Sequence, residues 1–147
     1  MTNREDIVLE ARSWIGTPYV HQASCKGGGT DCLGLIRGIW RTVIGSEPLI
    51  IPSYSSTWSN SNEGNTLLEA ASTWLKQKPI SSSDLGDVLL FRLGENGPGR
   101  HLGISAENRE CATFIHAYST HRVLETSLSV PWKRRIMARF EFPIGEK

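Results

Sequence analysis

Cys32 is the side chain of this sequence that is best placed to act as a nucleophile. It follows the glycine-rich stretch 26–29 and stands in the first turn of a predicted helix, for which Thr30 or Asp31 is the expected N-cap. The partial positive charge at a helix N-terminus stabilises a thiolate and lowers the pKa of the thiol, and the thiolate is the competent nucleophile. The alternative is a buried structural cysteine, because cysteine is among the residue types most often found in protein cores.

Two histidines could supply the proton transfers that such a nucleophile needs. His101 follows the stretch 97–100 at the start of a predicted strand, where the sheet would hold it facing the loop side, as suits a general base. His116 lies inside the predicted strand 114–117, where it could share a hydrogen bond with the first histidine and fix its tautomer. With Cys32 they would form a Cys-His-His arrangement. Taken singly, His101 could be an exposed loop residue and His116 a satisfied core residue.

Other site chemistries find less support. His21 lies near the turn before the glycine-rich stretch and could line a cleft, whereas His121 is expected in a solvated turn. The three cysteines are an odd number, which is poor material for a disulfide framework, although one bridge between Cys25 and Cys32 remains open. A zinc site from these two cysteines and the histidines would lack the usual ligand spacing. The glycines fit neither a dinucleotide-binding nor a phosphate-binding motif, so we expect no cofactor and no metal.

Three helices are expected in the first half of the chain. Thr2 and Glu5 have capping-box spacing at the start of the first helix, and Gly16 stops it. Gly34 and Gly38 inside the second helix cost about 1 kcal/mol each relative to alanine, so something is expected to pack close to its backbone. The apolar faces of the three helices are formed by Ile7, Ala11, Trp14 and Ile15; by Cys32, Ile36, Ile39, Trp40 and Val43; and by Leu67, Ala71, Trp74 and Leu75.

The second half of the chain changes to short, partly alternating apolar segments. These predict strands at 88–92, 102–106, 112–117, 123–126 and 136–142. A hairpin turn is expected at 119–122, and residues 46–65, rich in serine and asparagine, predict a long loop excursion. Helices followed by strands are typical of an α+β fold with N-terminal helices packed on a central antiparallel β-sheet, and residues 1–147 are expected to form one domain.

Composition excludes several classes of protein. A chain of 147 residues can bury a core without disulfides or metals. Lysine plus arginine number 16 and aspartate plus glutamate 15, so the net charge of +1 lacks the basic excess of a nucleic-acid-binding protein. No apolar run approaches the roughly 20 residues of a membrane helix, and residues 1–6 do not begin a secretory signal. We therefore expect synthesis in the cytoplasm without a signal peptide, no membrane insertion and no nucleic-acid partner.

Several short segments resemble, in order and in spacing, the motifs of the NlpC/P60 family of cysteine peptidases. These segments are residues 16–19, 30–35, 86–91, 101–104 and 114–117. The resemblance covers nearly the whole chain, and an ordered series of motifs is far more specific than any one of them. It implies a papain-like NlpC/P60 fold.

The resemblance also assigns residues to the catalytic steps. Cys32 matches the nucleophile, His101 the general base and His116 the polar residue that orients this base. Tyr19 matches the tyrosine whose hydroxyl helps to form the oxyanion site. Three further residues are expected to line the substrate site: Asp31, His21 and Gly103. Asp31 would also help to shape the turn before the nucleophile.

The match is closer to one branch of the family, the cell-wall peptidases found with tail genes of phages and gene-transfer agents. Residues 47–48, 51–54 and Trp58 resemble the insertion of this branch, and residues 116–119 and 131–136 resemble its C-terminal half. The resemblance implies two partners, the peptide substrate in peptidoglycan and a phage-like tail or baseplate protein. It implies a location in the tail of a phage-like particle, with action at the cell wall or in the periplasm.

The activity that the resemblance implies is that of a cysteine endopeptidase, a thiol hydrolase that cuts the stem peptides of peptidoglycan. The expected bond is the γ-linkage between D-glutamyl and a diamino acid. A cell-wall amidase of the same fold stays open, because specificity lies in the shape of the cleft. Leu33 and residues 20–23 depart from the family pattern at the cleft wall, which bears on the substrate subsites and not on the triad. A catalytically silent structural tail component also stays open, with Tyr54 and Trp58 of the long loop as docking residues.

Overall fold

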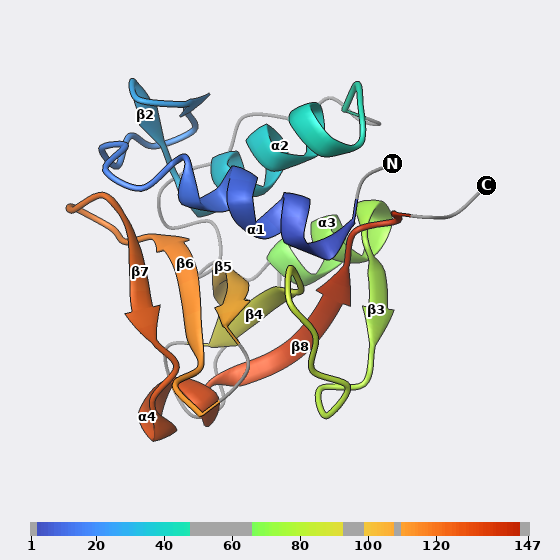
Figure 1. Cartoon of the computed structure of the whole chain (residues 1–147). Coiled ribbons are helices and arrows are strands. Elements are labelled where there is room, and N and C mark those ends of the chain that lie inside the picture. Colours follow the sequence, from blue (N-terminus) through green and yellow to red (C-terminus); the bar gives the residue numbers. More distant parts are fainter. Residues whose placement is uncertain (1–2, 48–65, 93–98, 108–109, 145–147) are drawn as a thin grey trace.

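The computed structural model describes residues 3–47, 66–92, 99–107 and 110–144, which form a layer of helices on an antiparallel sheet (Figure 1). The helices are α1 (Arg4–Arg12), α2 (Cys32–Val43), α3 (Thr66–Trp74) and α4 (Val130–Lys133). The main sheet contains β3 (Lys76–Lys78), β4 (Val88–Arg92), β5 (Gly99–Glu107), β6 (Thr113–Ala117), β7 (Val123–Ser127) and β8 (Ile136–Glu141). A separate hairpin is formed by β1 (Ser24–Cys25) and β2 (Gly29–Thr30). This arrangement confirms the predicted α+β fold.

The order of strands in the main sheet is β3-β8-β4-β5-β6-β7, and all neighbours are antiparallel. The strand β8, which comes last along the chain, lies between β3 and β4. The candidate histidines lie on adjacent strands, because His101 belongs to β5 and His116 to β6, and these two strands pair with Ile104 opposite Ile115. The topology therefore brings them together although they are separated by a strand, a turn and a second strand along the chain.

The two faces of the sheet carry different apolar clusters, because successive residues of a strand point to opposite faces. In β4, Val88 and Leu90 belong to the main core, which also contains the buried faces of α1, α2 and α3. Leu89 and Phe91 belong to a smaller cluster, to which α4 contributes Trp132. In Figure 1, α1 and α2 lie together over one side of the sheet, while α4 lies at the opposite end of the molecule.

The start of α2 is held by close backbone packing. Asp31 is its N-cap, and the carboxylate accepts a hydrogen bond of 2.7 Å from the N–H of Gly34. A Cβ on Gly34 would overlap the carbonyl oxygen of Ala23, and a Cβ on Gly38 would overlap the ring of Trp14. The prediction that something packs against the backbone of this helix is confirmed, and the close approach explains why both positions are glycine.

The capping box of α1 is one residue further along than predicted. The side chain of Asn3 accepts a hydrogen bond from the N–H of Asp6, at 3.0 Å, and the Asp6 carboxylate accepts one from the N–H of Asn3, at 2.9 Å. The predicted pairing of Thr2 with Glu5 is therefore wrong. Asparagine is a better N-cap than threonine, and aspartate at the third helical position can reach back to the cap as glutamate does.

The predicted apolar stripe of α1 is correct except at its last member. The other three residues of the stripe are buried, but Ile15 is 45% exposed. The helix ends at Arg12, and the chain then continues as a turn, so Ile15 no longer follows the helical path. The turn was not anticipated because the apolar spacing continues beyond the last helical residue.

The predicted strands are all present, and β4 has the predicted limits. The largest shift is in β5, which begins at Gly99 rather than at residue 102. The predicted turn at 119–122 joins β6 to β7, with Thr120 at a φ of 65°. The strand β3, the β1–β2 hairpin and α4 were not predicted, because β3 is polar and the other segments are very short. The third predicted helix is confirmed as α3, and residues 48–65 of the predicted long loop lie outside the described residues.

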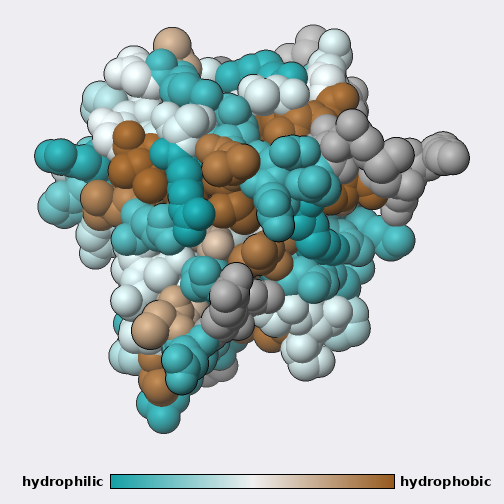
Figure 2. All heavy atoms as spheres, in the orientation of Figure 1, coloured by the Kyte–Doolittle hydropathy of each residue, from teal (hydrophilic) through white to brown (hydrophobic). Residues whose placement is uncertain are grey.

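The exposed surface carries scattered apolar groups. On the face in Figure 2, hydrophobic atoms form small groups that are separated by hydrophilic side chains. The most exposed large apolar side chain within the described ranges is Leu9 of α1, at 63%. Among the helices that the structure describes, none is both long and apolar enough to cross a membrane.

Candidate active site

Cys32 is the first residue of α2, and the N-cap Asp31 fixes the turn that presents it. Asp31 is buried, and its two carboxylate oxygens accept hydrogen bonds from the N–H groups of Gly34 (2.7 Å) and Gln22 (2.8 Å). The carboxylate thereby ties the segment before the β1–β2 hairpin to the first turn of α2. The thiol of Cys32 is half-buried and free, and Cys25 is free as well, so no disulfide joins these two cysteines.

The environment of Cys32 does not favour a resting thiolate. Burial, together with the charge of Asp31, raises the pKa of the Cys32 thiol to about 12. Backbone N–H groups of Leu102, Leu33 and Cys32 act in the opposite direction without reversing the shift. The prediction that the helix N-terminus lowers the pKa of this thiol is therefore wrong, because desolvation and the neighbouring carboxylate outweigh it. The sulfur needs a base to remove its proton as it reacts.

The two candidate histidines are joined by a hydrogen bond. Nε2 of His101 lies 2.6 Å from Nδ1 of His116, and both side chains are buried. Nε2 of His116 in turn lies 2.8 Å from Oγ1 of Thr126. The residue after His101 is Leu102, whose backbone N–H faces the sulfur of Cys32. The structure thus places the start of β5 beside the nucleophile. Hydrogen bonds connect His101 of β5 through His116 of β6 to Thr126 of β7.

An aromatic enclosure surrounds the histidine pair. The ring centroid of His116 lies 4.3 Å from that of Phe114 and 5.5 Å from that of Trp132. The ring centroid of His101 lies 6.1 Å from that of Phe91 and 6.0 Å from that of Trp132. Burial, with the nearby charge of His116, lowers the pKa of His101 to about 3, and burial lowers the pKa of His116 to about 4. Both imidazoles are therefore neutral near pH 7, and each ring has one nitrogen without a proton.

Tyr19 is held beside the nucleophile by backbone hydrogen bonds. Its N–H donates to the carbonyl oxygen of His121 at 3.1 Å, and it forms an isolated parallel bridge with Thr30. Burial, together with the charges of Cys32 and Asp31, raises the pKa of the Tyr19 hydroxyl to about 12. The hydroxyl therefore stays protonated near pH 7 and can donate a hydrogen bond to an oxyanion.

The two remaining predicted substrate residues lie in different surroundings. His21 is partly exposed, with its Nδ1 3.9 Å from the carboxylate of Asp31, so it lies beside the turn before the nucleophile. Gly103 is buried within the sheet, where an added Cβ would lie 2.8 Å from the ring of Phe114 and 3.5 Å from the Cβ of His116. Because Gly103 has no side chain, the ring of Phe114 can lie against the backbone of β5. Gly103 therefore serves the packing of the sheet.

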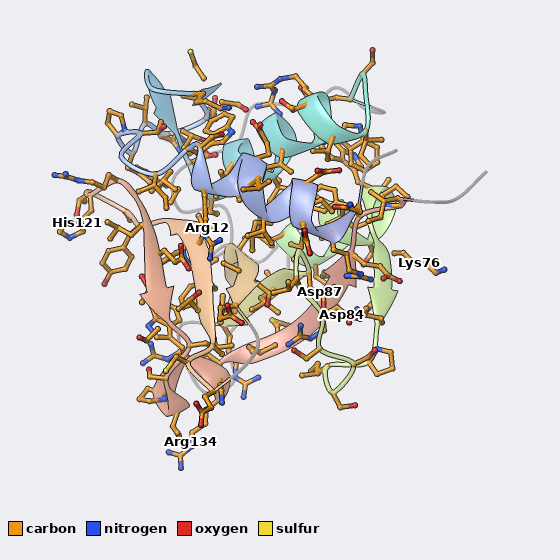
Figure 3. The ribbon with its side chains drawn as sticks, viewed as in Figure 1. Arg12, Lys76, Asp84, Asp87, His121 and Arg134 are labelled. Atoms are coloured by element: carbon orange, nitrogen blue, oxygen red, sulfur yellow. The ribbon has the colours of Figure 1, made fainter. Side chains whose placement is uncertain are left out.

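His121 lies at the tip of the β6–β7 turn and is exposed, as predicted (Figure 3). Its ring stacks on that of Tyr118, with centroids 5.1 Å apart and an angle of 9° between the planes. Among the described residues, no group of three or more His, Cys, Asp or Glu side chains is arranged to hold a metal ion.

Sequence reasoning missed two residues of this site, Thr126 and Trp132. No motif marks Thr126, because its contact with His116 depends on the register between β6 and β7. Trp132 lies in the short helix α4, and its position over the histidines depends on how that helix folds back on the sheet. Neither the contact of Thr126 nor that of Trp132 with the histidines can be predicted from the spacing of residues along the chain.

The buried histidines predict a loss of stability in weak acid. Their pKa values are about 3 and about 4 in the folded protein, against 6.5 for an ordinary histidine, so the unfolded chain binds more protons between these values. The contribution of the two neutral imidazoles to the free energy of unfolding is fully present above pH 6.5 and is lost as the pH falls from there toward their folded pKa values. We expect the free energy of unfolding in urea to fall by about 5 kcal/mol between pH 7 and pH 4.5, because each unfolded histidine titrates over about two pH units at about 1.4 kcal/mol per unit.

Two variants test the origin of this acid dependence. His101→Gln removes one of the buried titrating groups and is expected to flatten the pH dependence, whereas His121→Gln changes an exposed residue and is expected to preserve it. An unchanged slope in His101→Gln would show that the buried imidazoles are not its source.

Comparison with solved structures identifies the fold. The NlpC/p60 domain of the peptidoglycan hydrolase SagA has a TM-score of 0.63 and 25% sequence identity, over 96% of this chain and 100% of that domain. An NLP/P60-family protein of Staphylococcus aureus subsp. aureus Mu50, described as similar to a lipoprotein, has a TM-score of 0.62 and 18% identity over 95% of this chain. An NlpC/P60 family protein of Bacillus cereus ATCC 10987 has a TM-score of 0.66 and 18% identity over 96%. The fold is that of NlpC/P60 domains.

A family model described as the NlpC/P60 family matches residues 16–140. This chain therefore belongs to the NlpC/P60 family. It spans 41% of the length of the Staphylococcus aureus protein and 40% of that of the Bacillus cereus protein. The comparison with curated proteins gave no match.

Proposed function

We propose that this chain is a cysteine endopeptidase that hydrolyses the stem peptides of peptidoglycan. The observation that carries the proposal is the hydrogen-bonded pair of His101 and His116, whose first member adjoins the residue that contacts the Cys32 sulfur. Membership of the NlpC/P60 family and the likeness to a domain of a peptidoglycan hydrolase support the same class of substrate.

In the proposed reaction, Nδ1 of His101 accepts the proton of the Cys32 thiol as the sulfur attacks the carbonyl carbon of the scissile amide. The S–C bond forms while the electron pair of the C=O double bond moves onto oxygen. Collapse of this intermediate breaks the C–N bond, and the imidazolium of His101 donates its proton to the departing amine. Water then attacks the thioester with His101 again as base, which releases the carboxylic acid and restores the thiol.

The developing oxyanion has two donors in this proposal. One is a backbone N–H at the start of α2, and the other is the hydroxyl of Tyr19, whose raised pKa keeps it protonated. Asp31 holds the turn that carries the nucleophile, and its buried, hydrogen-bonded carboxylate favours this function over direct contact with substrate. His21, on the same turn and partly exposed, is the better placed of the two for substrate contact.

The proposed bond is the γ-linkage between D-glutamyl and the diamino acid, as the sequence resemblance implies. The resemblance of residues 116–119 and 131–136 to the tail-associated branch supports a place in a phage-like tail or baseplate, which would deliver the domain to the cell wall.

The test is digestion of purified diamino-acid-type peptidoglycan, with the products identified by mass spectrometry. A new free amine on the diamino acid is the expected product. Release of whole stem peptides would instead identify an amidase. No product from the wild-type protein under conditions in which it stays folded would overturn the proposal in favour of a silent structural component.

A further inference from the structure

Thr126 ends a hydrogen-bond chain that starts at His101. Nε2 of His101 lies 2.6 Å from Nδ1 of His116, and Nε2 of His116 lies 2.8 Å from Oγ1 of Thr126. The register explains the second contact, because Phe114 pairs with Thr126 while His116 pairs with Leu124. Thr126 is thus the diagonal neighbour of His116 on the same face of the sheet.

We propose that Thr126 is a positioning residue for the reaction at Cys32, an inference that rests on the proposed function. Its hydroxyl oxygen accepts the Nε2 proton of His116 and so fixes the tautomer of both histidines. In this arrangement Nδ1 of His101 keeps its lone pair for the thiol proton. Thr126 contacts neither the nucleophile nor the reacting atoms and acts through the two imidazoles.

A single shared proton decides which nitrogen of His101 is free to act as a base. Only one proton lies between Nε2 of His101 and Nδ1 of His116 when both rings are neutral. If this proton is bound to Nε2 of His101, Nδ1 of His101 is unprotonated and can act as a base. If it is bound to Nδ1 of His116, the proton of neutral His101 lies on Nδ1, and this nitrogen cannot act as a base. The productive case places a proton on Nε2 of His116, and this proton needs an acceptor.

The direction of both hydrogen bonds, from His101 to His116 and from His116 to Thr126, is fixed once His101 has taken the thiol proton. The imidazolium then donates from Nε2 to Nδ1 of His116, and His116 must donate from its own Nε2. Within the described part of the chain, the hydroxyl of Thr126 is the partner that this nitrogen has. Since His116 is only 1% exposed and lies against the rings of Phe114 and Trp132, water is a poor substitute there.

Thr126→Val tests the proposal because valine keeps the β-branched shape and removes only the hydroxyl. Thr126→Ser keeps the hydroxyl and is the rescue variant. Thr113→Val is the matched control, because Thr113 is also a strand threonine whose hydroxyl donates a hydrogen bond, at 2.7 Å to the exposed Glu125, but lies outside the histidine chain.

Two measurements are made on the full chain. The first is the ¹⁵N NMR signature of the imidazole nitrogens, assigned with His101→Gln and His116→Gln, which reports the tautomers without any substrate. The second is kcat and KM on a peptidoglycan stem peptide. We expect Thr126→Val to transfer protonation toward Nδ1 of His101 and to lower kcat about 10- to 100-fold with KM within about twofold of wild type. Thr126→Ser is expected to restore both, and Thr113→Val to change neither.

The two readouts separate this inference from the proposed function. Wild-type tautomers in Thr126→Val would overturn the role of Thr126 whatever happens to the rate, as would a wild-type His116 that carries its proton on Nδ1. An inactive wild-type protein with the expected tautomers, lost in Thr126→Val, would contradict the proposed function and leave the positioning role of Thr126 supported.

Discussion

Replacing Cys32 with alanine is expected to lower the turnover of peptidoglycan stem peptides by at least about 10⁴-fold while the protein stays folded. The thioester of the proposed reaction cannot form without the sulfur, and neither His101 nor Tyr19 can take its place. The effect on stability is expected to be small, because the thiol is half-buried and alanine is the residue most favourable in a helix. Removing the sulfur also leaves the hydrogen bonds of Asp31 to Gly34 and Gln22 intact.

The measurement is the initial rate of product formation together with the Tm of each protein. Cys25→Ala and Cys111→Ala are the matched controls, because both cysteines are free and exposed, and both variants are expected to keep wild-type rates. Product formation by Cys32→Ala at more than a few per cent of the wild-type rate would remove Cys32 from the mechanism. A low Tm in this variant would instead identify a structural function for the thiol.

Replacing Asp87 with alanine is expected to lower the free energy of unfolding by about 3–5 kcal/mol, the largest stability effect that we expect from a single change outside the active site. Asp87 is fully buried, and its carboxylate accepts hydrogen bonds from Arg4 (2.9 Å), Lys78 (3.0 Å) and Arg139 (2.8 Å). These cations come from α1, β3 and β8, so one carboxylate joins three elements. Its removal leaves Arg139, which is also buried, without its counter-charge.

Asp84→Ala is the matched control for this prediction. Asp84 lies close to Asp87 in Figure 3 and shares two of its cations, with Lys78 at 3.0 Å and Arg4 at 3.8 Å. Its side chain is 50% exposed, so the expected loss is below about 1 kcal/mol. Urea unfolding of both variants at pH 7 compares them directly. Equal losses would show that burial of the Asp87 carboxylate is not what makes its ion pairs important.

The sequence predicted the strands well because their signal is local. A short continuous run of apolar residues predicted β4, and the start of α2 followed from a capping residue placed after a glycine-rich loop. Cys32, His101 and His116 were marked in the same way, by residue type at the end or inside of a recognisable element. The strand β3 was not predicted because Lys76–Lys78 contain no apolar residue, so no alternation of apolar and polar residues marks it.

The remaining features depend on distant parts of the chain. The pKa of Cys32 is set by burial and by Asp31, and burial is decided only when the sheet and helices meet. Thr126 joins the histidines through strand register, and Trp132 covers them through the return of α4. The capping box of α1 was predicted one residue too early for a different reason. Thr2 with Glu5 and Asn3 with Asp6 have the same spacing, and asparagine is the better N-cap.

The position of β8 between β3 and β4 has a consequence for how the protein emerges from the ribosome. The last of the described strands to be synthesised is the neighbour of both β3 and β4, and it carries Arg139, the most buried cation around Asp87. Until residues 136–141 have left the exit tunnel, the earlier strands can form hairpins but cannot close the sheet on which His101 and His116 are held. The sheet is therefore completed in a single step, when one strand joins β3 and β4, two strands that are synthesised before it.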